Sequence, residues 1–136
     1  MIENAVSWFD GACVGNPGPM GIGGLIRLDN GDEHTISEYR GYGTNNVAEY
    51  TALIEILNLA KRLGVKNLSV HGDSLLVVNQ INGAWSVKND GLIPLHRTAR
   101  AIMKNIPGVS VKWVRREHNR HADRLAMLAL RDKKYL

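Results

Sequence analysis

Hydrophobic and polar positions in the first third of the 136-residue chain predict three β-strands. Residues 5–13, 22–28 and 34–42 are rich in apolar, β-branched and aromatic side chains, which favour strands. The intervening segments, 14–21 and 29–32, carry the Gly, Pro, Asn and Asp that are typical of turns. Three successive strands joined by turns predict an antiparallel meander.

The rest of the chain predicts helices that alternate with two further strands. Residues 44–63 form a long helix in which Glu49 lies in line with apolar residues on one face. The remaining segments are strands at 67–71 and 109–114 and helices at 74–81, at 92–105 and from Asn119 onward. This order, βββαβααβα, predicts one α/β domain over residues 1–136, with helices on the faces of a mixed sheet.

Charge is unevenly distributed along the chain. Residues 1–60 hold eight acidic and two basic side chains (−6), and residues 61–136 hold five acidic and fifteen basic ones (+10), which gives the net charge of +4. This asymmetry favours a polyanionic partner for the second half, with a solvated basic surface as the alternative. Cys13 is the only cysteine, which excludes an internal disulfide. No membrane span, secretory signal or large apolar patch is evident, so we expect a cytoplasmic monomer without membrane partners.

Asp10 is the most unusual residue of the pattern. It lies within an apolar strand that has the character of a strand buried on both faces. A buried carboxylate needs a partner, a metal ion or a proton, since an isolated buried charge is costly. No helix follows Asp10, so it is not a helix cap.

Three other acidic residues lie at helix starts or strand ends, and each has a structural alternative. Glu49 fits a capping box with Asn46, Asp73 could cap the helix that follows it, and Asp123 suits the first turn of the last helix. In a mixed sheet, however, such positions converge at one edge. Four clustered carboxylates would raise one another's pKa values, and two divalent ions would neutralise them. Magnesium prefers such oxygen ligands, and paired ions serve phosphodiester chemistry.

Four motifs of this sequence, in order, resemble type 1 ribonuclease H. They are the segments 10–19, 44–50, 72–74 and 118–126. The resemblance spans nearly the whole chain and implies a five-stranded mixed sheet flanked by helices. It also implies an endonuclease that hydrolyses the RNA strand of RNA–DNA hybrids without base-sequence specificity. Two Mg²⁺ or Mn²⁺ ions would be held by Asp10, Glu49, Asp73 and Asp123, and the products would carry 5′-phosphate and 3′-hydroxyl ends.

The resemblance further implies a set of substrate contacts. Glu49 would touch a ribose 2′-hydroxyl, the group that distinguishes RNA from DNA. The positions expected to contact the hybrid are Gly11, Ala12, Cys13, Asn16, Thr44, Asn45, Asn46, Trp85 and Lys88. Helix capping is the alternative for the Asn pair, a buried aromatic anchor for Trp85 and plain solvent exposure for Lys88.

Three departures from the family pattern affect the expected site. Leu75 stands where many relatives have Gln, which removes one polar substrate contact. The loop after Trp85 is too short for the basic protrusion of many bacterial relatives, so general basic charge would have to replace it. The loop before Asp123 is also shortened. His118, and after it His121, is the candidate for the family's mobile histidine in proton transfer or product release, with a surface histidine as the alternative.

Three rival functions remain to be weighed. An inactive hybrid-binding module would be expected to lack one of the four acidic residues, and all four are present. A transposase-type nuclease usually lacks the Asn45-Asn46 pair, and a sugar-kinase-like ATPase needs a second similar domain. Cleavage of double-stranded RNA as a side activity stays open.

Overall fold

The first third of the chain forms the predicted meander. In the computed structural model, which describes residues 3–136, β1 (Asn4–Cys13), β2 (Gly18–Leu28) and β3 (Glu33–Gly43) pair in antiparallel fashion. The predicted start of the second strand at residue 22 is wrong, because Met20 already pairs with Cys13. The Gly- and Pro-rich composition of residues 14–21 predicts a turn throughout, but residues 18–21 belong to β2. The turn itself is confined to residues 14–17.

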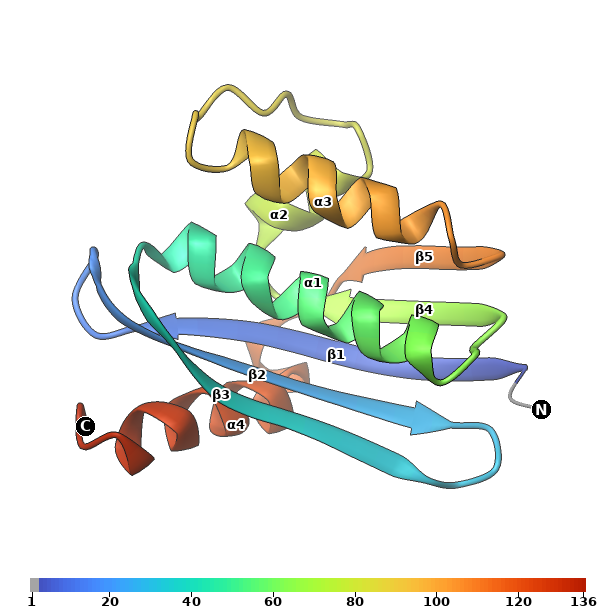
Figure 1. Cartoon of the computed structure of the whole chain (residues 1–136), viewed down its shortest axis with the longest axis horizontal. Coiled ribbons are helices and arrows are strands. Elements are labelled where there is room, and N and C mark those ends of the chain that lie inside the picture. Colours follow the sequence, from blue (N-terminus) through green and yellow to red (C-terminus); the bar gives the residue numbers. More distant parts are fainter. Residues whose placement is uncertain (1–2) are drawn as a thin grey trace.

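Helices and parallel strands complete the sheet. The later elements are α1 (Asn45–Arg62), β4 (Asn67–Gly72), α2 (Leu75–Ile81), α3 (Ile93–Met103), β5 (Gly108–Trp113), a short 3₁₀ turn (Arg116–His118) and α4 (Arg120–Asp132). The strand order is β3-β2-β1-β4-β5, with β4 parallel to both β1 and β5 (Figure 1). The predicted five-stranded mixed sheet flanked by helices is confirmed.

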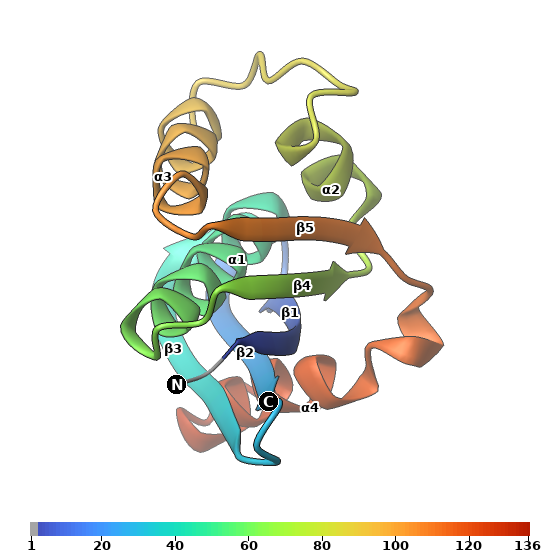
Figure 2. The ribbon, with the colours of Figure 1, turned by 90° about the vertical axis from the view of Figure 1, so that its right-hand side faces the viewer.

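The helices α1 and α4 lie on opposite faces of this sheet (Figure 2). A β-carbon at Gly23 would collide with the backbone of α4 at Ala122, whereas one at the next residue, Gly24, would meet Ile56 of α1. Since consecutive strand residues point to opposite faces, β2 is held between the two helices. The close approach of α4 therefore requires glycine at position 23.

The main core lies on the α1 side of the sheet. Phe9, Leu53, Ile56 and Val70 are fully buried there, as part of one hydrophobic cluster to which α3 also contributes. Burial extends around most of α1, because the helix is covered by the sheet on one side and by α3 on the other. Among residues 3–136, no helix combines the length and apolar character that a membrane span requires.

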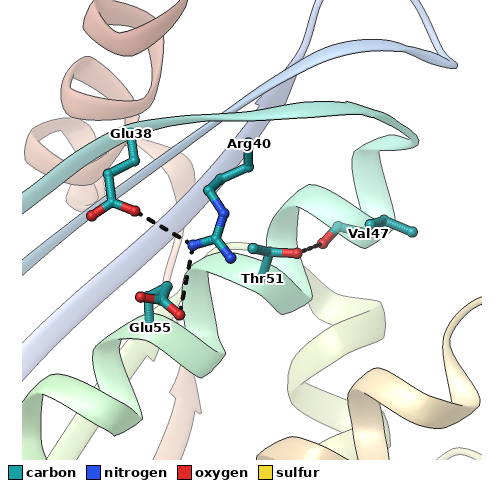
Figure 3. Close-up of polar contacts among 5 residues, drawn as sticks. All are labelled: Glu38, Arg40, Val47, Thr51 and Glu55. Carbon is teal, nitrogen blue, oxygen red and sulfur yellow. Dashed lines mark hydrogen bonds and ion pairs between the residues drawn. The ribbon is translucent and has the colours of Figure 1, made fainter.

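A surface ion pair joins β3 to the middle of α1. The Arg40 guanidinium lies 3.4 Å from Glu38 of its own strand and 3.6 Å from Glu55 of α1 (Figure 3). One turn earlier, the Thr51 hydroxyl donates a hydrogen bond of 2.7 Å to the Val47 carbonyl. Exposed pairs of this kind contribute roughly 1 kcal/mol at most, so they support the packing of α1 and do not determine it.

Candidate metal centre and nucleic-acid interface

Asp10 lies on the central strand of the sheet, at the end where the site forms. It pairs with Gly23 of β2, and the preceding residue, Phe9, pairs with Gly72 of β4. Strands therefore flank this position on both sides, and only 6% of the Asp10 surface is exposed. The structure thus agrees with the inference that Asp10 is a buried carboxylate.

Glu49 reaches the same place from α1. Gly11 permits this, because a β-carbon there would overlap the backbone of Ala48 and Glu49. The Glu49 carboxylate accepts a hydrogen bond from the backbone N–H of Gly11. The capping-box alternative is wrong, since Thr44 is the N-cap of α1 and accepts from the Val47 N–H at 3.2 Å.

Asp73 follows β4 directly and is not the cap of the next helix. Ser74 takes that role, and its hydroxyl accepts a hydrogen bond from the Val77 N–H at 3.3 Å. The Asp73 carboxylate is left free to face the cluster. One oxygen of each of Asp10, Glu49 and Asp73 lies within 4.8 Å of the others.

Asp123 completes the ring of acidic residues at a greater distance. It lies in the first turn of α4, where a negative charge also suits the helix dipole. It lies outside the tight group of three but lines the same cavity, whose volume is about 390 Å³. The other lining residues are Gly11, Ala12, Cys13, Asn45, Asn46, Ser74 and Arg116.

The three clustered carboxyl groups hold their protons more tightly than usual. Burial is the main cause of the rise in the pKa of Asp10 to about 11, and the charge of Glu49 adds to it. Burial also raises the pKa of Glu49 to about 7, against hydrogen bonds from Asp10 and from the Gly11 N–H that lower it. Burial raises the pKa of Asp73 as well. Full ionisation of this cluster at neutral pH therefore requires added positive charge.

The donor set fits a hard divalent cation. Carboxylate oxygens, with no sulfur or imidazole ligand in the group of three, are the ligands that Mg²⁺ and Mn²⁺ favour. Bound cations would also offset the burial and the charge repulsion that together raise these pKa values. Asp10, Glu49 and Asp73 are thus the residues able to hold such an ion, with Asp123 beside them.

Arg116 is a cavity residue to which the sequence analysis assigned no specific role. It projects from the 3₁₀ turn, lines the carboxylate cavity, and its charge lowers the pKa values of Glu49 and Asp73. The sequence indicated it only as one of the basic residues whose charge could replace the missing protrusion. His118 itself is exposed and lines a separate cavity with His121 and Arg120, so the structure does not bring it to the carboxylates.

Most of the expected substrate-binding residues surround the acidic cluster. Asn45 and Asn46, at the start of α1, line the cavity together with the end of β1. Asn16 lies beside them, because its side-chain oxygen accepts a hydrogen bond from the Asn45 N–H at 3.1 Å. Thr44 caps α1 and does not line the cavity.

Trp85 and Lys88 lie apart from the carboxylates. Both are exposed in the loop between α2 and α3, and 46% of the Trp85 surface is accessible. The alternative of a buried aromatic anchor is therefore wrong. Trp85 instead lines a second cavity, of about 600 Å³, with Arg97 and Arg100 of α3 and Lys104 directly after that helix.

Asn119 lies at the expected start of the last helix. It occupies the N-cap position of α4, but its side chain makes no capping bond. The fully buried amide instead donates a hydrogen bond of 2.9 Å to the carbonyl of Phe9, next to Asp10. Asn119 thus connects the start of α4 to the central strand at the site.

The fold and site together define a class of protein: an α/β domain with a carboxylate cluster at the end of its central parallel strand pair. A family model described as "Reverse transcriptase-like" matches residues 8–129. The chain is 40% identical over 121 residues to a bifunctional protein of Mycobacterium tuberculosis, covering 86% of this chain and 33% of that one. It is 39% identical to a ribonuclease HI of Halobacterium salinarum (93% and 64% covered) and 33% identical to a ribonuclease H of Anaplasma marginale (88% and 85% covered).

Solved structures agree with these relatives. The ribonuclease H1 of Halobacterium salinarum superimposes with a TM-score of 0.91 at 36% identity, covering 95% of this chain and 98% of that one. LC11-RNase H1 in complex with an RNA/DNA hybrid gives 0.88 at 36% identity, with the same coverage. The chain belongs to the ribonuclease H family. It spans about a third of the mycobacterial relatives and about two thirds of the halobacterial one.

Proposed function

We propose that this chain hydrolyses the RNA strand of RNA–DNA hybrids, as an endonuclease without base-sequence specificity. The observation that carries the proposal is the convergence of Asp10, Glu49 and Asp73 within 4.8 Å, in a cavity also lined by Asp123, Asn45 and Asn46. The family membership supports it, and so does the hybrid bound to a solved relative of the same fold. Residues 1–136 act in this proposal as one ribonuclease H domain.

Two divalent ions, Mg²⁺ or Mn²⁺, are the proposed cofactors. Asp10, Glu49, Asp73 and Asp123 would hold them, and the products would carry 5′-phosphate and 3′-hydroxyl ends. When bound, such ions supply water activation and stabilise both the attacking and the leaving oxygen of the phosphodiester. Arg116 adds a positive charge at the same cavity, where it can pair with the phosphate of the strand.

The remaining residues would bind and orient the hybrid. Amide groups such as those of Asn45 and Asn46 can both donate and accept, as a ribose 2′-hydroxyl or a base edge requires. The Glu49 carboxylate, held by the Gly11 N–H, lies where it can contact a 2′-hydroxyl. Trp85 and Thr44 would contact the DNA strand, and Lys88 would bind a phosphate. His118 stays a candidate for proton transfer or product release. Cytoplasmic location and monomeric state stay predictions.

Cleavage of a labelled hybrid tests the proposal directly. The RNA strand carries the label, and single-stranded RNA and double-stranded DNA of the same sequence serve as controls. We expect cutting of the hybrid alone, dependent on Mg²⁺ and abolished by EDTA. Cutting in EDTA, or tight binding of hybrid without cutting, would refute the assignment.

The variant Asp10→Asn tests the site within the same assay. It keeps the shape of the side chain and removes the charge, so we expect loss of turnover and weaker metal binding with the fold intact. Circular dichroism checks the fold, and calorimetric titration with Mn²⁺ checks the metal. Wild-type turnover in this variant would contradict the assignment of Asp10.

A further inference from the structure

Three arginines form an exposed row on α4 that the proposed site does not use. We define the arginine face as Arg120, Arg124 and Arg131, which lie within about 40° of one another around the helix. They extend over about 16 Å of the helix axis. Within residues 3–136, none of the three has an acidic side chain within ion-pair distance. Their charges are therefore available to an external anion.

A groove connects the arginine face to the carboxylate cavity. The groove has a volume of about 620 Å³ and is lined by the three arginines, by Met127 and by one further acidic residue, Glu117. Arg116 and Asp123 line both the groove and the carboxylate cavity. A chain whose phosphate lies at the carboxylates can therefore continue along α4 without leaving the protein surface.

The groove lies on the α4 side of the sheet, whereas the cavity lined by Trp85 lies beside α3. The helices α1 and α3 lie on one face of the sheet and α4 covers the other (Figures 1 and 2), and the carboxylate cavity, which Asn45 also lines, lies between these surfaces. A duplex is stiff over the length of this small domain, so bending it from one face to the other would cost several kcal/mol. A single strand can bend in this way, and cationic grooves are the usual binding surface for single strands.

We propose that the arginine face binds single-stranded RNA that continues the cleaved strand beyond the end of the hybrid. The inference rests on the proposed function, because that function places the RNA strand at the carboxylates and so makes RNA the strand connected to the groove. The preferred substrate is then a junction between hybrid and single-stranded RNA.

Binding to tailed hybrids tests this inference. The background is Asp10→Asn, which prevents cutting, and the readout is fluorescence anisotropy at several salt concentrations. A short blunt hybrid is compared with hybrids that carry a single-stranded RNA tail of about eight nucleotides at either end of the RNA strand. We expect one of the two RNA tails to tighten the Kd by roughly fivefold.

The double substitution Arg124→Ala/Arg131→Ala should remove most of that gain and leave the Kd of the blunt hybrid unchanged. The slope of log Kd against log salt should fall by about 1.4 for the tailed hybrid, since each phosphate contact to a single strand contributes about 0.7. The matched control is Lys61→Ala/Arg62→Ala at the far end of α1, which removes the same charge and should keep the gain. Thermal unfolding checks that both variants fold.

Three results would overturn the inference: no gain from either RNA tail, a gain that survives Arg124→Ala/Arg131→Ala, or an equal gain from a DNA tail on the DNA strand. Cleavage of the blunt hybrid by the wild-type chain is scored separately. A chain that cuts the blunt hybrid but shows no tail gain overturns this inference alone. A chain that does not cut it overturns the proposed function.

Discussion

Without bound metal, the buried Asp10 carboxyl group makes the folded protein less stable at neutral pH, and no neighbouring charge compensates for its burial. Burial raises its pKa from 3.8 to about 11, and the charges of Glu49 and Asp73 act in the same direction. The folded state therefore keeps a proton that the unfolded chain releases above pH 4. It follows that Asp10 favours folding at low pH and that this contribution is lost as the pH rises toward the folded-state pKa.

The pH dependence of stability should reveal this cost. In EDTA, the wild-type free energy of unfolding should fall between pH 5 and pH 8, whereas Asp10→Asn should show a shallower fall. At pH 8 the variant should be more stable by about 1–3 kcal/mol, because a neutral amide replaces a group that resists ionisation. Urea unfolding at the two pH values measures the difference. Parallel pH profiles for the two proteins would contradict the assignment of this cost to Asp10.

Arg116 opposes the effect of burial at the same cavity. Its charge lowers the pKa values of Glu49 and Asp73, so it keeps these groups ionised to lower pH. Arg116→Ala should therefore shift the acid limb of the pH–rate profile upward and slow hybrid cleavage at pH 6 by roughly three- to tenfold. Arg116→Lys should recover much of the acid limb, since it restores the charge.

The neighbouring Arg115 supplies the control for this prediction. It is exposed and does not line the carboxylate cavity, so Arg115→Ala removes the same charge without removing the local field. Its pH–rate profile should keep the wild-type shape. If Arg115→Ala shifts the acid limb as far as Arg116→Ala does, overall charge is the cause and the local explanation is wrong.

At the scale of elements, glycine determines how closely α4 approaches the sheet. Gly23→Val would force a side chain into the backbone of Ala122, and neither β2 nor α4 can move without disturbing the site. We expect a loss of about 3 kcal/mol or more in the free energy of unfolding. The control Gly91→Ala meets only the flexible side chain of Asn89 and should cost less than about 1 kcal/mol. Urea unfolding of both variants makes the comparison, and equal losses would contradict the packing argument.

The sequence predicted the elements well where hydrophobic periodicity is strong. The strand containing Asp10 and the helix containing Glu49 lie close to where they were expected, because alternation and 3.6-residue spacing reflect burial directly. The prediction missed the first residues of β2, because glycines usually indicate a turn. Here they pair with β1 and allow α4 to pack closely, a tertiary requirement that local composition does not reveal.

The site was predictable to the extent that its residues follow known motifs. The four acidic residues converge on one cavity as the resemblance implied. The contribution of Arg116 and the bond from Asn119 to Phe9 were not predictable, because both depend on where the turn before α4 meets the end of β1. The expectation for His118 came from a motif whose loop is shortened here, and the structure leaves that side chain outside the cavity.

At the scale of the whole molecule, the charge asymmetry of the sequence corresponds to two separate cationic surfaces. The basic second half supplies Arg97, Arg100 and Lys104 beside Trp85 and the arginine face along α4. These two cationic surfaces lie on opposite sides of the sheet, and the acidic cluster lies at the sheet edge between them. Of the two, the arginine face adjoins the carboxylates directly, because Arg116 and Asp123 line both its groove and their cavity.

The same arrangement couples metal binding to the stability of the entire fold. The carboxylates come from β1, α1, the end of β4 and α4, so cations that bind them join four elements and relieve the repulsion among buried charges. Ligand at a hundredfold excess over its Kd adds about 2.7 kcal/mol, which for a domain of this size raises the Tm by roughly 5–10 °C. Thermal unfolding in Mg²⁺ or Mn²⁺, against NaCl of equal ionic strength, measures this rise. Asp10→Asn should lose most of the rise because it removes a ligand from the centre of the cluster, while Arg115→Ala should keep it. An equal rise in NaCl, or a full rise in Asp10→Asn, would show that the ions act elsewhere on the surface.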